Sequence, residues 1–312
     1  MANVSPTSAG APAAGRARSS PLGSRLGFQH WALAPLLLFL VLFAFYPVAE
    51  LARMAFSTTD PSGGDFGWQF SGLDNLRAML RDDVFGAALR NTLLFVVAAT
   101  LLQLVLGTAL ALLVERSRWF SGLARNVLVW PALVTPVAIS VTWWLILNPE
   151  FGLLNHASTV LGLPTQAWLA STRWALPTLV LVDVWHWTPL VFLIVLAGLS
   201  SIDRTLYEAA QTDGASGWRT FWSITLPLLA PTLLVAAVIR TVLGFKVFDE
   251  IYLLTGGGPG TATEVVSTRV ADVFLGQLDM GYGAFLGLVI VAVLILLVLA
   301  LSRVGNLFGG AG

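Results

Sequence analysis

Charged side chains inside long apolar runs are the first feature of this sequence that could do chemistry. Asp183 and His186 lie in the run Trp174–Leu199, and Arg240 lies in the run Trp222–Leu243. An ionisable side chain in a membrane span costs about 2.5–3.5 kcal/mol on insertion scales, so such residues mark solute pathways or internal pairs. Asp183 and Arg240 lie at similar depths along their runs. An ion pair between two helices and direct contact with a solute are both open, and the two are compatible.

The same region carries side chains suited to a polyhydroxylated solute. Aromatic faces can pack on the C–H surfaces of a sugar, while charged and polar groups bind its hydroxyls. The rings would come from Trp185, Trp187 and Phe248, and the hydrogen bonds from Asp183, Lys246 and Asp249. Lys246 and Arg240 also leave open an anionic substrate, such as a sugar or polyol phosphate. Tryptophan is enriched at membrane interfaces as well, and that is the interpretation we give to Trp143, Trp144 and Trp174.

Other kinds of chemistry lack their residues. The chain has no cysteine, and His30, His156 and His186 lie too far apart for a metal site. His186 is expected to be a packed, hydrogen-bonded side chain and not a proton relay. Lys246 is the only lysine and follows Phe245, so the phosphate-binding pattern Gly-x-x-x-x-Gly-Lys-Ser/Thr cannot occur. With no Ser/His/Asp grouping either, we expect no catalytic residue and no nucleotide site in this chain.

The elements that must position these residues are membrane helices. Of the 312 residues, 56% are hydrophobic and only 11% are charged, against about a quarter charged in soluble domains. The apolar residues gather in six runs near the length that crosses a bilayer: Ala32–Val48, Asn91–Val114, Val127–Leu147, Trp174–Leu199, Trp222–Leu243 and Phe285–Leu301. Backbone in lipid must satisfy its own hydrogen bonds, and the alternating segments of a β-barrel do not occur. The sequence therefore predicts an all-α integral membrane protein with six transmembrane helices.

The predicted organisation has four parts. Residues 1–30, rich in Ala, Ser, Pro and Gly with three arginines, form a disordered basic arm. Residues 31–90 form the first transmembrane helix and an external loop, residues 91–303 the core transmembrane domain, and residues 304–312 a tail. The first apolar run exceeds the usual ~7–15-residue core of a signal peptide, and no Ala-x-Ala site follows it. We therefore expect a retained span.

The distribution of arginine and lysine favours cytoplasmic N- and C-termini, with nine basic residues in the inside segments against seven in the outside loops. Most acidic loop residues then lie outside. The external loops are long, at roughly residues 50–90, 148–173 and 244–283. They could form a docking surface for a soluble partner or be ordinary solvated loops.

The inside loop between the fourth and fifth runs has the pattern of a short helix, a turn and a second helix. Thr205-x-x-Glu208 has the spacing of a capping box, which would begin the first helix. Gly214 would end it in the left-handed conformation. An aromatic and apolar stripe, formed by Trp218, Phe221, Trp222 and Ile224, then leads into the next span.

This loop resembles the signature loop of permeases from binding-protein-dependent ATP-binding-cassette (ABC) importers. The resemblance rests on Glu208-Ala209-Ala210, then Asp213-Gly214-Ala215, and nine residues later Ile224-x-Leu226-Pro227. It implies the type I importer permease fold, with a cytoplasmic coupling helix that docks on the ATPase. The residues it assigns to that coupling are Tyr207, Glu208, Ala209, Ala210, Asp213, Gly214 and Ala215.

A second region resembles the carbohydrate branch of that family, which includes permeases for maltose, trehalose and glycerol-3-phosphate. It begins at Phe248-Asp249 and continues through the Thr255-Gly256-Gly257-Gly258-Pro259 run to Gly281-Tyr282-Gly283-Ala284. The likeness covers about residues 30–303. It places Asp183, Trp187, Arg240, Gly244 and Lys246 at positions that line the sugar site in the maltose-type permease.

The resemblance also implies partners. They are two ATPase copies, which would bind the ATP and Mg, a second related permease and an extracytoplasmic binding protein, all at the bacterial inner membrane. No cofactor is expected in this chain, and neutral net charge gives no indication of nucleic acid.

One competing interpretation is a secondary transporter driven by an ion gradient, with Asp183, His186 and Arg240 as coupling residues. The paired broken helices of inverted repeats are not evident, and the Glu208 loop would have no purpose there. Another is a scaffold protein, which would not need charges in its spans.

Overall fold

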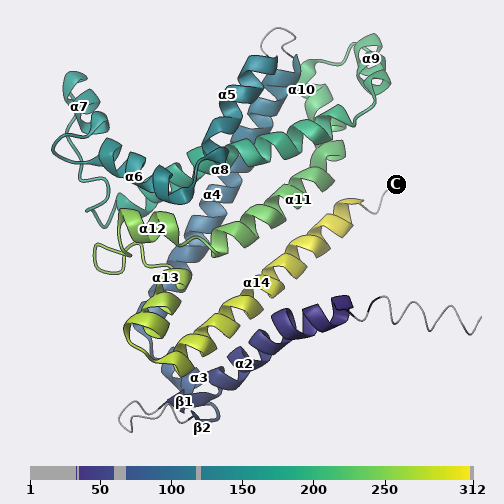
Figure 1. Cartoon of the computed structure of the whole chain (residues 1–312). Helices are drawn as coiled ribbons and strands as arrows, with labels where there is room; N and C mark the ends of the chain where they lie inside the picture. Colours follow the sequence, from purple (N-terminus) through teal and green to yellow (C-terminus); the bar gives the residue numbers. More distant parts are fainter. Residues whose placement is uncertain (1–32, 34, 60–67, 117–120, 310–312) are drawn as a thin grey trace, which may run out of the picture. The chain divides into compact units, whose positions relative to one another are not determined.

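The computed structural model describes residue 33 and residues 35–59, 68–116 and 121–309 (Figure 1). The predicted arm lies outside the described residues. The chain forms two compact units, residues 1–50 and 51–312. In the first unit a helix begins at Pro35, contains a π-helical turn, Val41–Phe45 (η1), and continues into α2, Tyr46–Ala55. The side chains of residues 35–49 are exposed all round it, as expected of a helix that faces lipid or another chain.

Five helical segments of the described chain are long and apolar enough to cross a membrane, and they agree with five of the six predicted runs. They are Pro35–Ala55, Asp83–Glu115, Ala175–Ser200, Gly217–Phe245 and Met280–Arg303. The last four are formed by α4 (Asp83–Arg116), α8 (Ala175–Ser200), α10 (Gly217–Thr220) with η3 (Phe221–Thr225) and α11 (Leu226–Phe245), and α14 (Met280–Gly309). The prediction of an all-α membrane protein is confirmed.

The prediction of one continuous span over the remaining run, Val127–Leu147, was wrong. It consists of two helices, α5 (Ser121–Leu133) and α6 (Pro136–Leu147), which meet at an angle of 107°. Proline disfavours helical backbone in the residue before it, and Thr135 is accordingly extended, with ψ 146°. Pro136 then begins α6, where its missing N–H costs no hydrogen bond.

The core forms where α4, α8 and α11 cross (Figure 1). Toward the end of these helices at which α9 (Arg204–Thr212) and α10 lie, it contains Val191, Phe192, Val195 and Leu229, all fully buried. Gly107 lets α4 and α8 approach closely, because a Cβ there would lie 2.8 Å from Cγ1 of Val191 and 3.0 Å from the backbone N of Phe192. α5 packs on α8, and α14 packs on α11.

The predicted external loops are folded. The first contains strands β1 (Ser57–Thr59) and β2 (Trp68–Phe70), paired antiparallel, and α3 (Asp74–Met79). The second contains α7 (Leu153–Val160), and the third contains α12 (Asp249–Leu254), α13 (Val266–Ala271) and a π-helical turn, Asp272–Gly276 (η4). Within residues 51–312, α3, β1 and β2 lie at one end of α4 and α14, whereas α9 (Arg204–Thr212) lies with α10 at the opposite end of α8 and α11 (Figure 1).

Candidate functional site

A buried polar network joins three spanning helices at the centre of the fold. Arg240 of α11 donates from Nη2 to Oδ2 of Asp183 on α8 at 2.7 Å, and from Nε to Oε1 of Gln103 on α4 at 2.6 Å. Gln103 closes the triangle by donating from Nε2 to Asp183 Oδ2 at 2.8 Å. The three residues are at most 2% exposed. The predicted interhelical ion pair is thus confirmed, and its charges neutralise each other inside the bundle.

The two tryptophans near Asp183, Trp185 and Trp187, lie in different surroundings. The guanidinium of Arg240 lies over the Trp187 ring, 5.3 Å from its centroid. Trp185 is 45% exposed, meets Trp143 of α6 edge to face at 5.6 Å, and lines an apolar groove along α4, α5 and α8. Side chains two residues apart on a helix point to different sides of it. The two rings therefore have different surroundings, and their place in one sugar site stays a prediction.

The other predicted pathway residues lie at and beyond the end of α11. Gly244 is buried against Val96 of α4, whereas Lys246 and Asp249 are exposed. Phe248 stacks on Tyr252 with ring centroids 5.2 Å apart. Both rings line a 530 Å³ cavity whose polar walls include Glu264, Arg269 and Asp272. It lies at the end of the fold that carries α12 and α13, which is called the outer end here after the predicted orientation. The predicted set therefore divides into a buried network and a group at the outer end.

The outer end is held together by Asp82, the residue directly before α4. Its carboxylate accepts hydrogen bonds from Arg269 of α13 at 2.8 Å, from the Tyr282 hydroxyl of α14 at 2.8 Å and from the Phe85 backbone N–H at 2.9 Å. Burial alone would raise the pKa of Asp82, but these hydrogen bonds and the charge of Arg269 outweigh it and hold the pKa below its ordinary value. This cluster fixes three elements to one another.

The glycine-rich loop is also fixed, by polar residues at the start of α4. Asn91 donates from Nδ2 to the carbonyls of Thr261 and Glu264 at 2.8 and 3.0 Å, and the Thr92 hydroxyl accepts from Val266 N–H at 3.0 Å. These hydrogen bonds hold the loop in a fixed position at the outer end.

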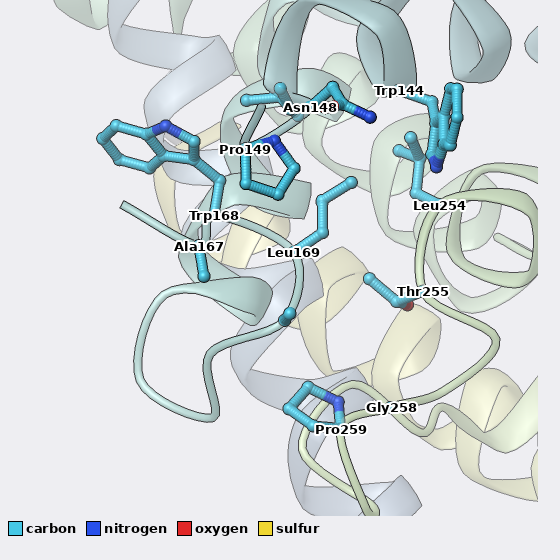
Figure 2. A pocket seen from close by; sticks show the side chains of 12 residues that line it. Trp144, Asn148, Pro149, Ala167, Trp168, Leu169, Leu254, Thr255, Gly258 and Pro259 are labelled. Carbon is cyan, nitrogen blue, oxygen red and sulfur yellow. The ribbon is translucent and has the colours of Figure 1, made fainter. Parts of the chain in front are cut away.

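Beside this loop is a second pocket, of 380 Å³, between the end of α6 and the end of α12. Figure 2 shows Trp144 and Leu254 on one side of it, Trp168 and Pro149 on the other, and Pro259 below. Trp168 is held in place by Asn155 of α7, whose side-chain oxygen accepts from its indole N–H at 2.9 Å. The outer end thus offers two preformed concave surfaces with aromatic walls.

At the opposite end of the fold, which the predicted orientation places inside, α9 presents the predicted coupling loop. The capping-box prediction was wrong in register: Asp203 is the N-cap, and its side chain accepts from the Thr205 backbone N–H at 2.9 Å. That hydrogen bond holds the pKa of Asp203 below its ordinary value. Asp203 is the residue directly before α9, so its carboxylate can accept this N–H, whereas Thr205 lies inside the helix. The other end agrees with the prediction, since Gly214 has φ +71° and closes the helix.

The side chains of the coupling loop face in two directions. Glu208, Ala209, Asp213 and Gly214 are exposed, whereas Ala210 is buried and Tyr207 and Ala215 are half-buried. The Tyr207 hydroxyl lies 3.2 Å from that of Thr225, in the π-helical turn that leads into α11. The aromatic stripe follows, with Trp218 73% exposed and Trp222 51% exposed. The loop therefore has an exposed edge and a direct hydrogen bond to the helix that carries Arg240.

Comparison with known proteins gives this geometry its context. A family model described as "Binding-protein-dependent transport system inner membrane component" matches residues 103–307. The chain belongs to this family.

Individual relatives agree with that membership. The sulfoquinovosyl glycerol transport system permease protein SmoG of Agrobacterium fabrum is 34% identical, over 87% of each chain. The trehalose/maltose transport system permease protein MalF of Thermococcus litoralis is 36% identical over 76% of this chain and 80% of its own. A bacterial ABC transporter chain involved in alginate import shares the fold, with a TM-score of 0.77, 24% identity and coverage of 91% of this chain and 96% of its own.

As a family member, the chain is a multi-pass membrane permease, and the matched region contains both the polar network and the coupling loop. Sequence reasoning missed two polar residues of the interior. Gln103 carries no charge, so it did not stand out in its apolar run, although an amide among Leu and Val is itself a signal. Glu250 is only 6% exposed. It directly follows Phe248-Asp249, which the sequence pattern placed in an external loop, so it was not distinguished from the exposed Asp249 beside it.

Proposed function

We propose that this chain is one of the two membrane subunits of an ATP-driven importer that moves a saccharide or related polyol. The observation that carries the proposal is the family match over residues 103–307, because it includes the buried network and the coupling loop in one continuous region. An extracytoplasmic binding protein would deliver the solute, and ATP would be hydrolysed on separate subunits.

The substrate class is inferred from the relatives and the site together. Relatives between 31% and 36% identical are named for sulfoquinovosyl glycerol, trehalose/maltose and sn-glycerol-3-phosphate, which are all polyhydroxylated. The Arg240 guanidinium is neutralised by Asp183 and bound by Gln103, so it offers no unbalanced charge to an anion in this conformation. That favours a neutral solute. The exposed Lys246 keeps a polyol phosphate as the second candidate.

Transmission from the ATPase would begin at the exposed edge of α9. Closure of the ATPase would move Glu208 and its neighbours, and the hydrogen bond between the Tyr207 and Thr225 hydroxyls would pass that motion to the base of α11. α11 carries Arg240, fifteen residues after Thr225, in the network that ties it to α4 and α8. A rigid connection of this kind lets a cytoplasmic event change the packing at the centre of the membrane.

Orientation and assembly complete the proposal. The coupling loop and both termini would face the cytoplasm, and the folded external loops would face the binding protein. Two ATPase copies and a second, related permease would complete the complex. The exposed apolar surface of the first helix is consistent with contact with lipid or with that second permease.

The test is purification in detergent together with the products of neighbouring genes, followed by ATPase assay in lipid. We expect a four-chain membrane complex whose ATP hydrolysis is stimulated by one loaded binding protein. Glu208→Ala should reduce stimulation, whereas Asp249→Ala, an exposed carboxylate at the other end, should not affect assembly. A chain that purifies without an ATPase and moves solute unaided would contradict the proposal and favour an ion-gradient-driven transporter.

A further inference from the structure

His186 is a buried side chain whose two ring nitrogens both meet oxygen atoms. Its Nδ1 lies 3.2 Å from Oε1 of Glu250 on α12, and its Nε2 lies 3.2 Å from the backbone oxygen of Val134. The imidazole is completely buried, and Glu250 is 6% exposed. Water therefore has little access to supply a missing donor or acceptor at either nitrogen.

The partners restrict where hydrogens can be. A backbone carbonyl only accepts hydrogen bonds, so Nε2 must carry a hydrogen. A neutral ring then has a bare Nδ1, which faces a carboxylate that also only accepts when ionised. A hydrogen bond forms only if one more proton is present, either on Nδ1 as imidazolium or on Glu250 as a carboxylic acid.

The opposite tautomer is disfavoured on two counts. It would donate from Nδ1 to Glu250 but leave the bare Nε2 against the Val134 carbonyl, with two lone pairs facing each other. It would also leave one negative charge buried without compensation. Of the charged groups nearby, Asp183 and Arg240 are committed to each other, while α6, which packs on α12, carries no ionisable side chain.

We propose that His186 and Glu250 hold one shared proton at neutral pH and that this proton ties α12 to the break between α5 and α6. Val134 lies in that break, directly after the end of α5, so its carbonyl lacks a partner in continued helix. α6 and α12 contribute Trp144 and Leu254, which lie on the same side of the pocket in Figure 2. The proton thus fixes α12 against the start of α6 on that side of the pocket, whatever solute the protein carries.

The proposal has a thermodynamic consequence. Above about pH 6.5 a histidine in the unfolded chain is mostly neutral and a glutamate is ionised. The folded pair therefore binds one proton more than the unfolded chain, and stability must fall as the pH rises. Glu250→Gln removes this dependence, because the amide N–H donates to Nδ1 with no added proton. It should keep the tie that Glu250→Ala breaks.

The experiment measures the melting temperature of the full-length chain, purified in detergent with its accompanying subunits, from about pH 7 to pH 9.5. Asp249→Asn, in the adjacent exposed carboxylate, is the matched control. At neutral pH we expect Glu250→Gln to match the control and Glu250→Ala to melt about 5 °C lower. With rising pH the control should lose more stability than Glu250→Gln. Equal pH profiles for the two, or a Glu250→Gln variant as unstable as Glu250→Ala, would overturn the proposal.

A direct measurement of the tautomer supports or refutes the same point. The chain has three histidines, so nitrogen-15 labelling of histidine gives few signals, and the His186→Asn spectrum identifies the one of interest. We expect Nε2 to be protonated, with Nδ1 either protonated or accepting a hydrogen bond. A bare Nε2 beside a protonated Nδ1 would overturn the shared proton, while leaving the transport proposal unaffected.

Discussion

Removing one partner of the buried ion pair should be far more harmful than removing both. Asp183→Ala leaves the guanidinium of Arg240 buried without its carboxylate partner, although it keeps the bond to Gln103 and its place over the Trp187 ring. Breaking a buried pair in this way costs about 3–5 kcal/mol, whereas replacing both charges by apolar groups of similar volume is often neutral or stabilising. The large effect therefore comes from the stranded charge and not from the attraction itself.

The magnitude can be carried through to a melting temperature. About 4 kcal/mol corresponds to a fall of roughly 10 °C in a domain of this size class. The double variant Asp183→Leu with Arg240→Met should recover most of that loss. Recovery will be incomplete, because Gln103 Oε1 loses its donor, although its Nε2 still reaches the Asp183 backbone carbonyl at 3.1 Å. Adding Gln103→Leu should restore the remainder.

The assay is thermal unfolding of the purified complex in one detergent and at one pH, followed by size-exclusion chromatography. Asp249→Ala serves as the control, since it removes an exposed carboxylate. The reasoning would be refuted if Asp183→Ala melted with the wild type. It would also be refuted if the double variant lost as much as the two single losses together, because the charges would then contribute independently.

Three further predictions concern the coupling loop, the helix crossing and the outer end. Gly214→Val places a branched side chain at φ +71°, so we expect a loss of about 1 kcal/mol and weaker stimulation of ATP hydrolysis; unchanged stimulation would show that the cap does not matter for coupling. Gly107→Leu should lower the melting temperature by overpacking against Val191, at a cost of about 1–3 kcal/mol, whereas the same change at Gly287, which has open space around it, should not. The pKa of Asp82 is lowered in the folded chain, so its contribution to stability is present above the ordinary value of 3.8 and disappears as the pH falls below it. Asp82→Asn should therefore reduce the loss of stability in acid when unfolding is measured over a pH series. An unchanged pH profile would contradict the assignment.

The sequence was sufficient to predict the features that depend on composition over long segments or on charge. Apolar runs near bilayer length predicted the spans, and two opposite charges at similar depth predicted the pair of Asp183 and Arg240. The glycine after a short helix likewise predicted its left-handed end, because few other residues adopt that backbone.

The features that the sequence did not predict depend on local competition or on three-dimensional direction. A hydropathy run continues through Thr135-Pro136, so the bend of 107° was hidden, although proline within a span is a signal for one. Asp203 and not Thr205 is the cap because α9 begins at Arg204, which leaves Thr205 inside the first turn. Trp185 and Trp187 were grouped by proximity in sequence, whereas helix geometry directs them to different surroundings.

The most direct test of the central claim is solute uptake by liposomes that contain the assembled complex. ATP is enclosed or omitted, a loaded binding protein is added outside, and ion gradients are imposed separately. The account predicts accumulation only when ATP and the loaded binding protein are both present, and its loss in Glu208→Ala with the complex intact. Uptake that follows an imposed ion gradient and ignores ATP would contradict it.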